Sequence, residues 1–331
     1  MAAHTDMKVD AVIPTYGDPS HLAEAIESVL AQTVDSWLLT IVYNDPGDGP
    51  ASKTIEPYLD HPRVSCVPTR EVLPQADNWS KAIQAGSAPY VAMLHDDDVW
   101  DPDYIERRVN FLDAQPACGF VFSSWREIDE SGDELEAVEY RLSEGVHEPI
   151  DFVPVLFHDM LIGSPTIMVR RQAYEAVGPV FDGRFKNIDW EMWMRIAVRY
   201  PVGYLAVRDC GRRLHFGSLT SRSRGWGDEE LALVDRFEEI VERELPELRL
   251  ARRPRLRRRS AAHLMAAMDE IESGNRQAAL RHLGGSLRTD PSRLVDPRLG
   301  AALAAAALGE RGRRRLARVR AGRAERRITR R

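Results

Sequence analysis

Cysteine is scarce in this sequence, and long apolar runs are absent from it. The 331 residues include Cys66, Cys118 and Cys210, which are scattered and lack the spacing of a metal-binding cluster. This pattern is typical of a reducing compartment and argues against a disulfide-stapled secreted fold. No apolar run approaches the ~20 residues that a membrane-spanning helix needs. No basic stretch followed by an apolar run opens the chain, as a signal peptide would require. We therefore expect a cytoplasmic protein.

Two motifs of phosphate chemistry are missing as well. A nucleotidyltransferase would place glycines and a lysine after its first strand, where this chain has Pro14-Thr15-Tyr16-Gly17-Asp18. The phosphoryl-transfer motif Asp-x-Asp-x-Thr would lie on the first strand and would need a threonine where this chain has Trp100. The sequence therefore disfavours both of these enzyme classes.

Charge is unevenly distributed along the chain. Residues 1–230 carry a net charge of −18 and residues 231–331 one of +12, which indicates an acidic domain joined to a basic one. We predict a first domain over 1–227, a helical domain over 228–309 and an arginine-rich tail over 310–331. The tail is either a solvated segment or an interfacial helix that would bring the protein to the anionic inner face of a membrane. Nucleic-acid binding is disfavoured because no aromatic residues are interleaved with the arginines.

Short apolar runs alternate with amphipathic segments in the first half of the chain. Strands are predicted over 9–13, 38–43, 64–67 and 90–94, and later over 119–123 and 166–170. Ser20 would cap the first helix, and Asp101 with Pro102 would begin a later one. Residues 129–148 are acidic and predict a loop or an exposed hairpin, and the chain is helical from Asp228 onward. The pattern predicts an α/β fold, a mostly parallel sheet with helices on both faces, followed by an α-helical C-terminal region.

Three carboxylates follow a strand that we expect to be buried. Asp96, Asp97 and Asp98 come directly after His95 at the end of the strand over 90–94. Repelling charges in such a place need a cation nearby, and carboxylate oxygens are the ligands that Mg²⁺ and Mn²⁺ prefer. Ligands of parallel sheets bind beyond the carboxyl ends of the strands, so we predict a site for a metal and a phosphate-bearing ligand there. The alternative interpretation is a solvated loop.

Seven short motifs, taken in order, resemble those of the family 2 glycosyltransferases, which have the GT-A fold. The resemblance covers residues 9 to about 222. The motifs are Ala11-Val12-Ile13-Pro14-Thr15-Tyr16, Ser28-Val29-Leu30-Ala31-Gln32-Thr33, Ile41-Val42-Tyr43-Asn44-Asp45, Asn78-Trp79-Ser80-Lys81-Ala82, Leu94-His95-Asp96-Asp97-Asp98, Asp189-Trp190-Glu191-Met192-Trp193-Met194-Arg195 and Arg213-Leu214-His215.

The resemblance implies a nucleotide-diphospho-sugar donor, with a UDP-sugar favoured. Asp45 would accept a hydrogen bond from the base, although Asn44 stands where the family usually has the first acid of an Asp-Asp pair. In the later acidic motif, His95 occupies the position at which the family usually has its first acid. The implied donor contacts are Pro14, Thr15, Tyr16, Asp45, Asn78, Lys81, His95, Asp96 and Arg213.

The same resemblance implies a divalent metal, Mn²⁺ or Mg²⁺, and an inverting reaction. Asp97 would be the main metal ligand, with Asp98 and His215 at the same metal. Asp189 aligns with the catalytic base, which would take the proton of an acceptor hydroxyl; the alternative is that it only caps a helix. The acceptor would be a glycan, a lipid-linked glycan or a small molecule. A rival function is a non-catalytic protein that binds nucleotide sugars or a partner through its helical C-terminus.

Overall fold

The structure is a computed structural model, and it describes residues 7–17, 19–44, 49–159, 162–178, 180–215, 226–248 and 252–307. It divides into two compact units, Met1–Leu214 and His215–Arg331. Our predicted boundary after residue 227 lies inside a helix of the second unit, α9 (Trp226–Glu244). The predicted arginine-rich tail, 310–331, lies outside the described residues.

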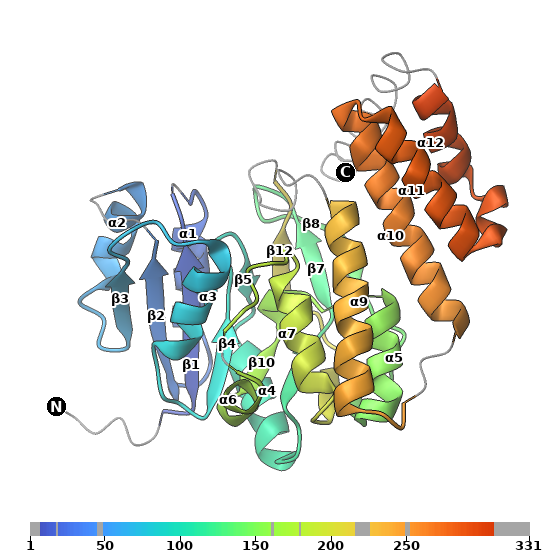
Figure 1. Cartoon of the computed structure of the whole chain (residues 1–331). Helices are drawn as coiled ribbons and strands as arrows, with labels where there is room; N and C mark the ends of the chain where they lie inside the picture. Colours follow the sequence, from blue (N-terminus) through green and yellow to red (C-terminus); the bar gives the residue numbers. More distant parts are fainter. Residues whose placement is uncertain are drawn as a thin grey trace. The chain divides into compact units, whose positions relative to one another are not determined.

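An eight-stranded sheet forms the centre of the first unit, in the order β3-β2-β1-β4-β10-β6-β11-β9; Figure 1 shows β3, β2 and β1 side by side. Its first four strands are mutually parallel, and each contains one of the predicted apolar runs. β10 runs antiparallel to both of its neighbours, and β9 is antiparallel to β11, so the sheet is mixed beyond β4. The strands are β1 (Val9–Thr15), β2 (Trp37–Tyr43), β3 (Val64–Pro68), β4 (Tyr90–Met93), β6 (Phe120–Ser123), β9 (Gly145–His147), β10 (Met168–Arg170) and β11 (Val202–Leu205).

Helices cover both faces of this sheet. Side chains alternate between the faces along each strand, so each strand offers apolar residues to helices on both sides. On one face, Val9, Ala11 and Ile13 of β1 share a buried apolar cluster with α1 (Leu22–Leu30) and α4 (Tyr104–Ala114). On the other face, Phe120 of β6 packs against aromatic rings of α5 (Pro149–Asp159) and α7 (Ile188–Ala197). The first unit also contains α2 (Pro50–Ile55), α3 (Gln75–Gln84) and α6 (Arg171–Val177).

A second, smaller sheet has the order β5-β12-β7-β8. It contains β5 (Val99–Trp100), β7 (Trp125–Ile128), β8 (Glu134–Val138) and β12 (Cys210–Arg213). The prediction of a loop or an exposed hairpin over 129–148 was right in part, because this segment contributes one strand to a hairpin and another strand to the larger sheet. β8 pairs with β7, whereas β9 pairs with β11 of the larger sheet.

Two predicted helix starts differ from the structure. The residue before α1 is His21, not Ser20, and no side chain caps that end. α4 begins after Asp103 rather than Asp101. The carboxylate of Asp101 instead accepts two hydrogen bonds from the Arg126 guanidinium, at 2.5 and 2.9 Å. A tertiary ion pair has therefore replaced the expected local cap.

The second unit is helical, as predicted. α10 (Arg252–Ser273) and α11 (Arg276–Thr289) are joined at Gly274, which has a φ of 82°. α12 (Pro297–Ala307) lies beside them (Figure 1), and the three helices enclose an apolar cluster that includes Leu264, Leu283 and Leu299. α9 approaches α10 closely, since a Cβ added to Gly227 would lie 1.9 Å from the backbone nitrogen of Ala266. Within the described ranges, no helix is both long and apolar enough to cross a membrane.

Candidate functional site

The predicted site residues gather at the carboxyl ends of the parallel strands. Thr15 at the end of β1 pairs with Tyr43 at the end of β2, and Val12 pairs with Met93 at the end of β4. The segment 95–98, which we call the acidic loop, follows β4 at this edge. Asp45, the predicted base contact, lies outside the described residues.

Asn44 follows β2 and is buried, and its side chain has a structural role that the sequence did not reveal. Its amide nitrogen donates to the carbonyl of Leu73 at 2.9 Å. Its amide oxygen accepts from the backbone N–H of Leu73 at 2.8 Å and from the Thr69 hydroxyl at 3.2 Å. An ionised aspartate could accept these bonds but could not donate to Leu73. This donated bond is a physical reason for asparagine at this position.

His95, Asp97 and Asp98 form a cluster suited to a metal ion. One ligand atom from each lies within 4.8 Å of the others. The Nδ1 atom of His95 is 3.3 Å from a carboxylate oxygen of Asp98, and its Nε2 atom is buried without a hydrogen-bond partner in the described part of the chain. A carboxylate on one ring nitrogen is the usual arrangement of a metal-binding histidine. These residues therefore fit a divalent metal, with His95 an additional candidate ligand.

The charges of the acidic loop perturb one another. Burial would lower the pKa of His95, but Asp98, with smaller effects from Asp97 and Asp189, raises it to about 9. Burial and the nearby Asp97 charge raise the pKa of Asp96 to about 6, despite opposing contributions from Thr15, His95 and Tyr16. Burial and Asp97 also raise the pKa of Asp98. The loop is thus an electrostatically strained group of carboxylates, which a cation would stabilise.

Arg213 of β12 holds the acidic loop in place. Its backbone N–H donates to the Asp98 carboxylate at 2.8 Å, and its Nε donates to the carbonyl of Asp97 at 2.9 Å. Its terminal nitrogens donate to the carbonyls of Asp129 and Glu130 and to the Glu24 carboxylate. The Arg213 side chain is 0% exposed. We therefore interpret it as a residue that positions the loop rather than one that reaches a ligand.

Asp189 lies in the first turn of α7, and Asn187 occupies the N-cap position, so Asp189 is not the cap. One of its carboxylate oxygens accepts from the Trp190 backbone N–H at 2.8 Å. The other accepts from the Ser164 hydroxyl at 2.7 Å. The charge of Asp189 also acts on His95. The structure therefore brings the predicted base and the acidic loop into electrostatic range of each other.

The remaining predicted residues are distributed as follows. Pro14 and Thr15 are buried at the end of β1, whereas the Tyr16 side chain is exposed. On α3, Asn78 is buried, and its side-chain oxygen has no hydrogen-bond partner among residues that the structure describes. Lys81 on the same helix is half-buried. His215, a predicted metal ligand, is the first residue of the second unit, and its role stays a prediction.

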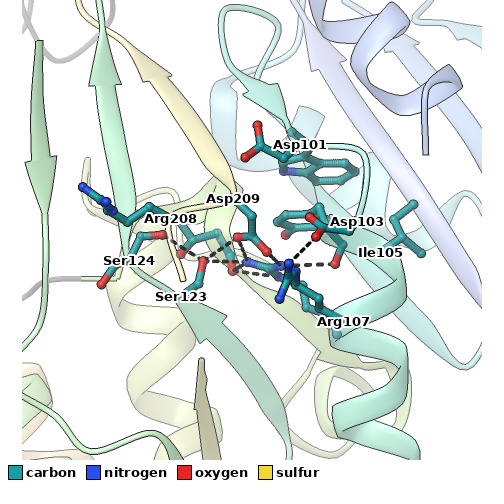
Figure 2. Close-up of polar contacts among 12 residues, drawn as sticks. Asp101, Asp103, Ile105, Arg107, Ser123, Ser124, Arg208 and Asp209 are labelled. Atoms are coloured by element: carbon teal, nitrogen blue, oxygen red, sulfur yellow. Dashed lines mark hydrogen bonds and ion pairs between the residues drawn. The ribbon is translucent and has the colours of Figure 1, made fainter. Parts of the chain in front are cut away.

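A buried ion pair near this site was missed from the sequence. Arg108 of α4 donates to both oxygens of Asp209 at 2.8 and 2.9 Å, and the Ser123 hydroxyl donates to the same carboxylate at 3.0 Å. Figure 2 shows Ser123 and Asp209 within this network. Arg108 also donates to the carbonyl of Thr166. The sequence did indicate that Arg108 is buried, because it falls on the same face of α4 as Ile105 and Leu112.

The chain is similar to known proteins in sequence and in fold. Residues 10–178 match the family described as Glycosyl transferase family 2. An uncharacterised glycosyltransferase of Methanocaldococcus jannaschii is 24% identical over 56% of this chain and 63% of its own length. The putative teichuronic acid biosynthesis glycosyltransferase TuaG of Bacillus subtilis is 24% identical over 50% of this chain and 62% of its own. The chain thus spans less than two thirds of the length of both relatives.

A solved structure shares the fold over most of the chain. The crystal structure of S. aureus TarS 1-349 in complex with UDP-GlcNAc superposes with a TM-score of 0.66 at 12% identity. The match covers 94% of this chain and 90% of that chain. The predicted fold, a GT-A unit followed by a helical region, is therefore confirmed.

Proposed function

Since the chain belongs to glycosyl transferase family 2, we propose that it transfers a sugar from a nucleotide-diphospho-sugar to a hydroxyl group of an acceptor. The observation that carries this proposal is the convergence of two groups from distant parts of the chain. The acidic loop supplies a cluster that fits a metal, and Asp189 supplies a carboxylate whose charge acts on that loop. A sugar-nucleotide displacement needs both a group that stabilises the leaving diphosphate and a base for the acceptor.

The donor would lie across the carboxyl edge of β1, β2 and β4. Pro14, Thr15 and Tyr16 would line the base pocket together with Asp45, and Asn78, Lys81, His95 and Asp96 would complete the donor contacts. A UDP-sugar is favoured, and the complex of TarS with UDP-GlcNAc on the same fold supports this choice. Among the residues that the structure describes, the side-chain oxygen of Asn78 has no hydrogen-bond partner, so it could accept from a hydroxyl or amide donor of the ligand.

A divalent metal, Mn²⁺ or Mg²⁺, would be held by Asp97, with Asp98 as the other proposed ligand and His95 as a further candidate. The metal would offset the negative charge that develops on the diphosphate leaving group. Asp98 already accepts from Arg213 and pairs with His95, so it would act chiefly by orienting the histidine ring. Asp97, whose carbonyl is held by Arg213, would present its carboxylate.

Asp189 would act as the base of an inverting reaction. Its carboxylate would accept the proton of the acceptor hydroxyl as that oxygen bonds to the anomeric carbon, and the diphosphate would leave with the electron pair of the broken bond. The proposed acceptor is a glycan, a lipid-linked glycan or a small molecule. A peripheral membrane contact through the basic C-terminus remains part of the lipid-linked proposal.

Donor turnover across a panel of sugar nucleotides, with Mn²⁺ or Mg²⁺ present, tests this function. We expect Asp189→Asn to lower kcat by about 10²- to 10⁴-fold while donor affinity in calorimetry is retained. Asp97→Asn should weaken metal-dependent donor binding. Asp60→Asn removes an exposed carboxylate and serves as the control.

The possible outcomes separate the two functions that the sequence left open. Turnover that depends on both Asp97 and Asp189 supports the transferase. Donor binding without turnover on any acceptor would instead favour the non-catalytic binding protein. Full activity of Asp189→Asn would refute the proposed base.

A further inference from the structure

Ser164 lies in a rigid turn next to the proposed base. The turn, Ser164–Thr166, is a single 3₁₀ element that precedes β10, and Ser164 is 2% exposed. The Trp100 indole donates to the carbonyl of Pro165 at 2.7 Å, and Arg108 donates to that of Thr166 at 3.0 Å. Both donors are buried. The turn is therefore held from the core and has little freedom to move.

The hydroxyl of Ser164 is a second hydrogen-bond donor to the Asp189 carboxylate. It donates to Oδ2 at 2.7 Å, while Oδ1 accepts from the Trp190 backbone N–H at 2.8 Å. Two donors on different elements, one on each oxygen, prevent the carboxylate from rotating about its Cβ–Cγ bond. Each oxygen has two lone pairs, so a lone pair of Oδ2 stays available to a further donor.

We propose that Ser164 is a positioning residue that aims the free lone pair of Asp189 at the acceptor hydroxyl. The inference rests on the proposed function of Asp189 as base. In the step concerned, the acceptor O–H bond breaks, its proton passes to Oδ2, and the oxygen bonds to the anomeric carbon as the diphosphate departs. Proton transfer requires heavy atoms within hydrogen-bond reach in the correct direction, and Ser164 sets that direction.

Ser164→Ala should therefore lower kcat by about 10- to 100-fold, the value expected for a hydrogen bond to a charged group. The KM for the donor and the donor affinity in calorimetry should stay unchanged, because Ser164 has no part in donor binding. Ser164→Thr retains a hydroxyl and should restore a measurable part of the lost kcat.

Thr166→Val provides a matched control within the same turn. The Thr166 hydroxyl is also buried and donates to the carbonyl of Gly163 at 2.8 Å, whereas the donors to Asp189 within the described part of the chain are Ser164 and Trp190. If Ser164 merely stabilised the turn, Thr166→Val would lower kcat as much as Ser164→Ala does. We expect it to leave kcat within about twofold of the unmodified protein, a change below RT in free energy.

A double-mutant cycle with Asp189→Asn separates failure of this inference from failure of the proposed function. We expect Ser164→Ala to have no further effect on kcat once Asp189 is replaced, because coupled residues are not additive. If Asp189→Asn abolishes turnover but Ser164→Ala does not change it, only the role of Ser164 is overturned. If Asp189→Asn remains fully active, the proposed base itself is wrong. Thermal melting of each variant identifies any that fails to fold.

Discussion

Replacing Asp209 by asparagine should destabilise the first unit strongly. The Asp209 side chain is buried and forms a bidentate pair with Arg108, whose side chain is 0% exposed. Asparagine has nearly the same shape, so Asp209→Asn removes the charge without creating a cavity. The guanidinium of Arg108 is then left as a buried cation without a counter-charge.

The expected loss is about 3–5 kcal/mol in the free energy of unfolding, the range found when one partner of a buried ion pair is removed. For a unit of this size, such a loss corresponds to a fall in Tm of about 6–20 °C. The neutral hydrogen bonds that asparagine can still make, to Ser123 and to one guanidinium nitrogen, place the value toward the lower end. Arg108 also holds the carbonyl of Thr166, so Arg108→Met should cost at least as much.

Urea denaturation followed by intrinsic fluorescence measures this loss. Asp60→Asn, which removes an exposed carboxylate, is the control and should change the midpoint little. In the cycle of Arg108→Met with Asp209→Leu, the double variant should lose less than the sum of the single variants. A loss below about 1 kcal/mol for Asp209→Asn, the range of an exposed pair, would refute the reasoning.

Three further predictions follow from contacts elsewhere in the chain. Asn44→Asp removes the donor to Leu73 and should cost about 1–3 kcal/mol, seen as a lower urea midpoint at unchanged slope; an unshifted midpoint would contradict the anchoring role. Gly227→Ala places a methyl against α10 and should cost about 2 kcal/mol or more, detected as faster proteolysis of the second unit. Burial would raise the pKa of Glu238, but its hydrogen bonds and charge interactions with Arg255 and Arg259 lower it. The stabilising contribution of the ionised Glu238 to folding is therefore present above the unfolded pKa of ~4.3 and is lost as the pH falls through the folded pKa. Glu238→Gln should make the free energy of unfolding depend less on pH in the acidic range.

Apolar runs predicted β1, β2 and β4 well because these strands lie inside the sheet and are almost entirely buried. They read as mostly hydrophobic segments, as a parallel sheet under helices requires, whereas the edge strand β3 is partly exposed. β5 and β12 were not predicted, since a two-residue strand has no periodicity to detect and β12 contains Arg212 and Arg213. Their pairing joins positions more than a hundred residues apart, and local patterns carry no information on such contacts.

Local signals failed where a tertiary partner competed for the same side chain. Aspartate is a favoured helix cap, but the carboxylate of Asp101 forms an ion pair with Arg126 of β7 instead. The sequence cannot show that partner, because the two residues meet only through the fold. Ser164 was overlooked for a related reason: beside Gly163 and Pro165 it has the composition of an ordinary turn. Its importance appears only with the hydrogen bond to Asp189.

The candidate site could be predicted where its residues belong to short motifs that follow one another in a fixed order along the chain. The acidic loop and Asp189 were identified by their order along the chain, and the structure brings their charges within range of one another. The position of Arg213 was also identified, but its buried contacts with the loop were not. The motif residues could be found in the sequence, whereas contacts that hold them in place, such as those of Arg213 and Ser164, depend on the fold.

The acidic loop joins two different sheets, since β4 belongs to the eight-stranded sheet and β5 to the four-stranded one. Its ends are therefore fixed independently, and an inserted or deleted residue between 94 and 99 would have to shift one sheet against the other. In the course of divergence, length changes should accumulate instead in surface connections such as the one between β8 and β9. The acidic loop is therefore expected to keep its length, while the lengths of the surface connections vary.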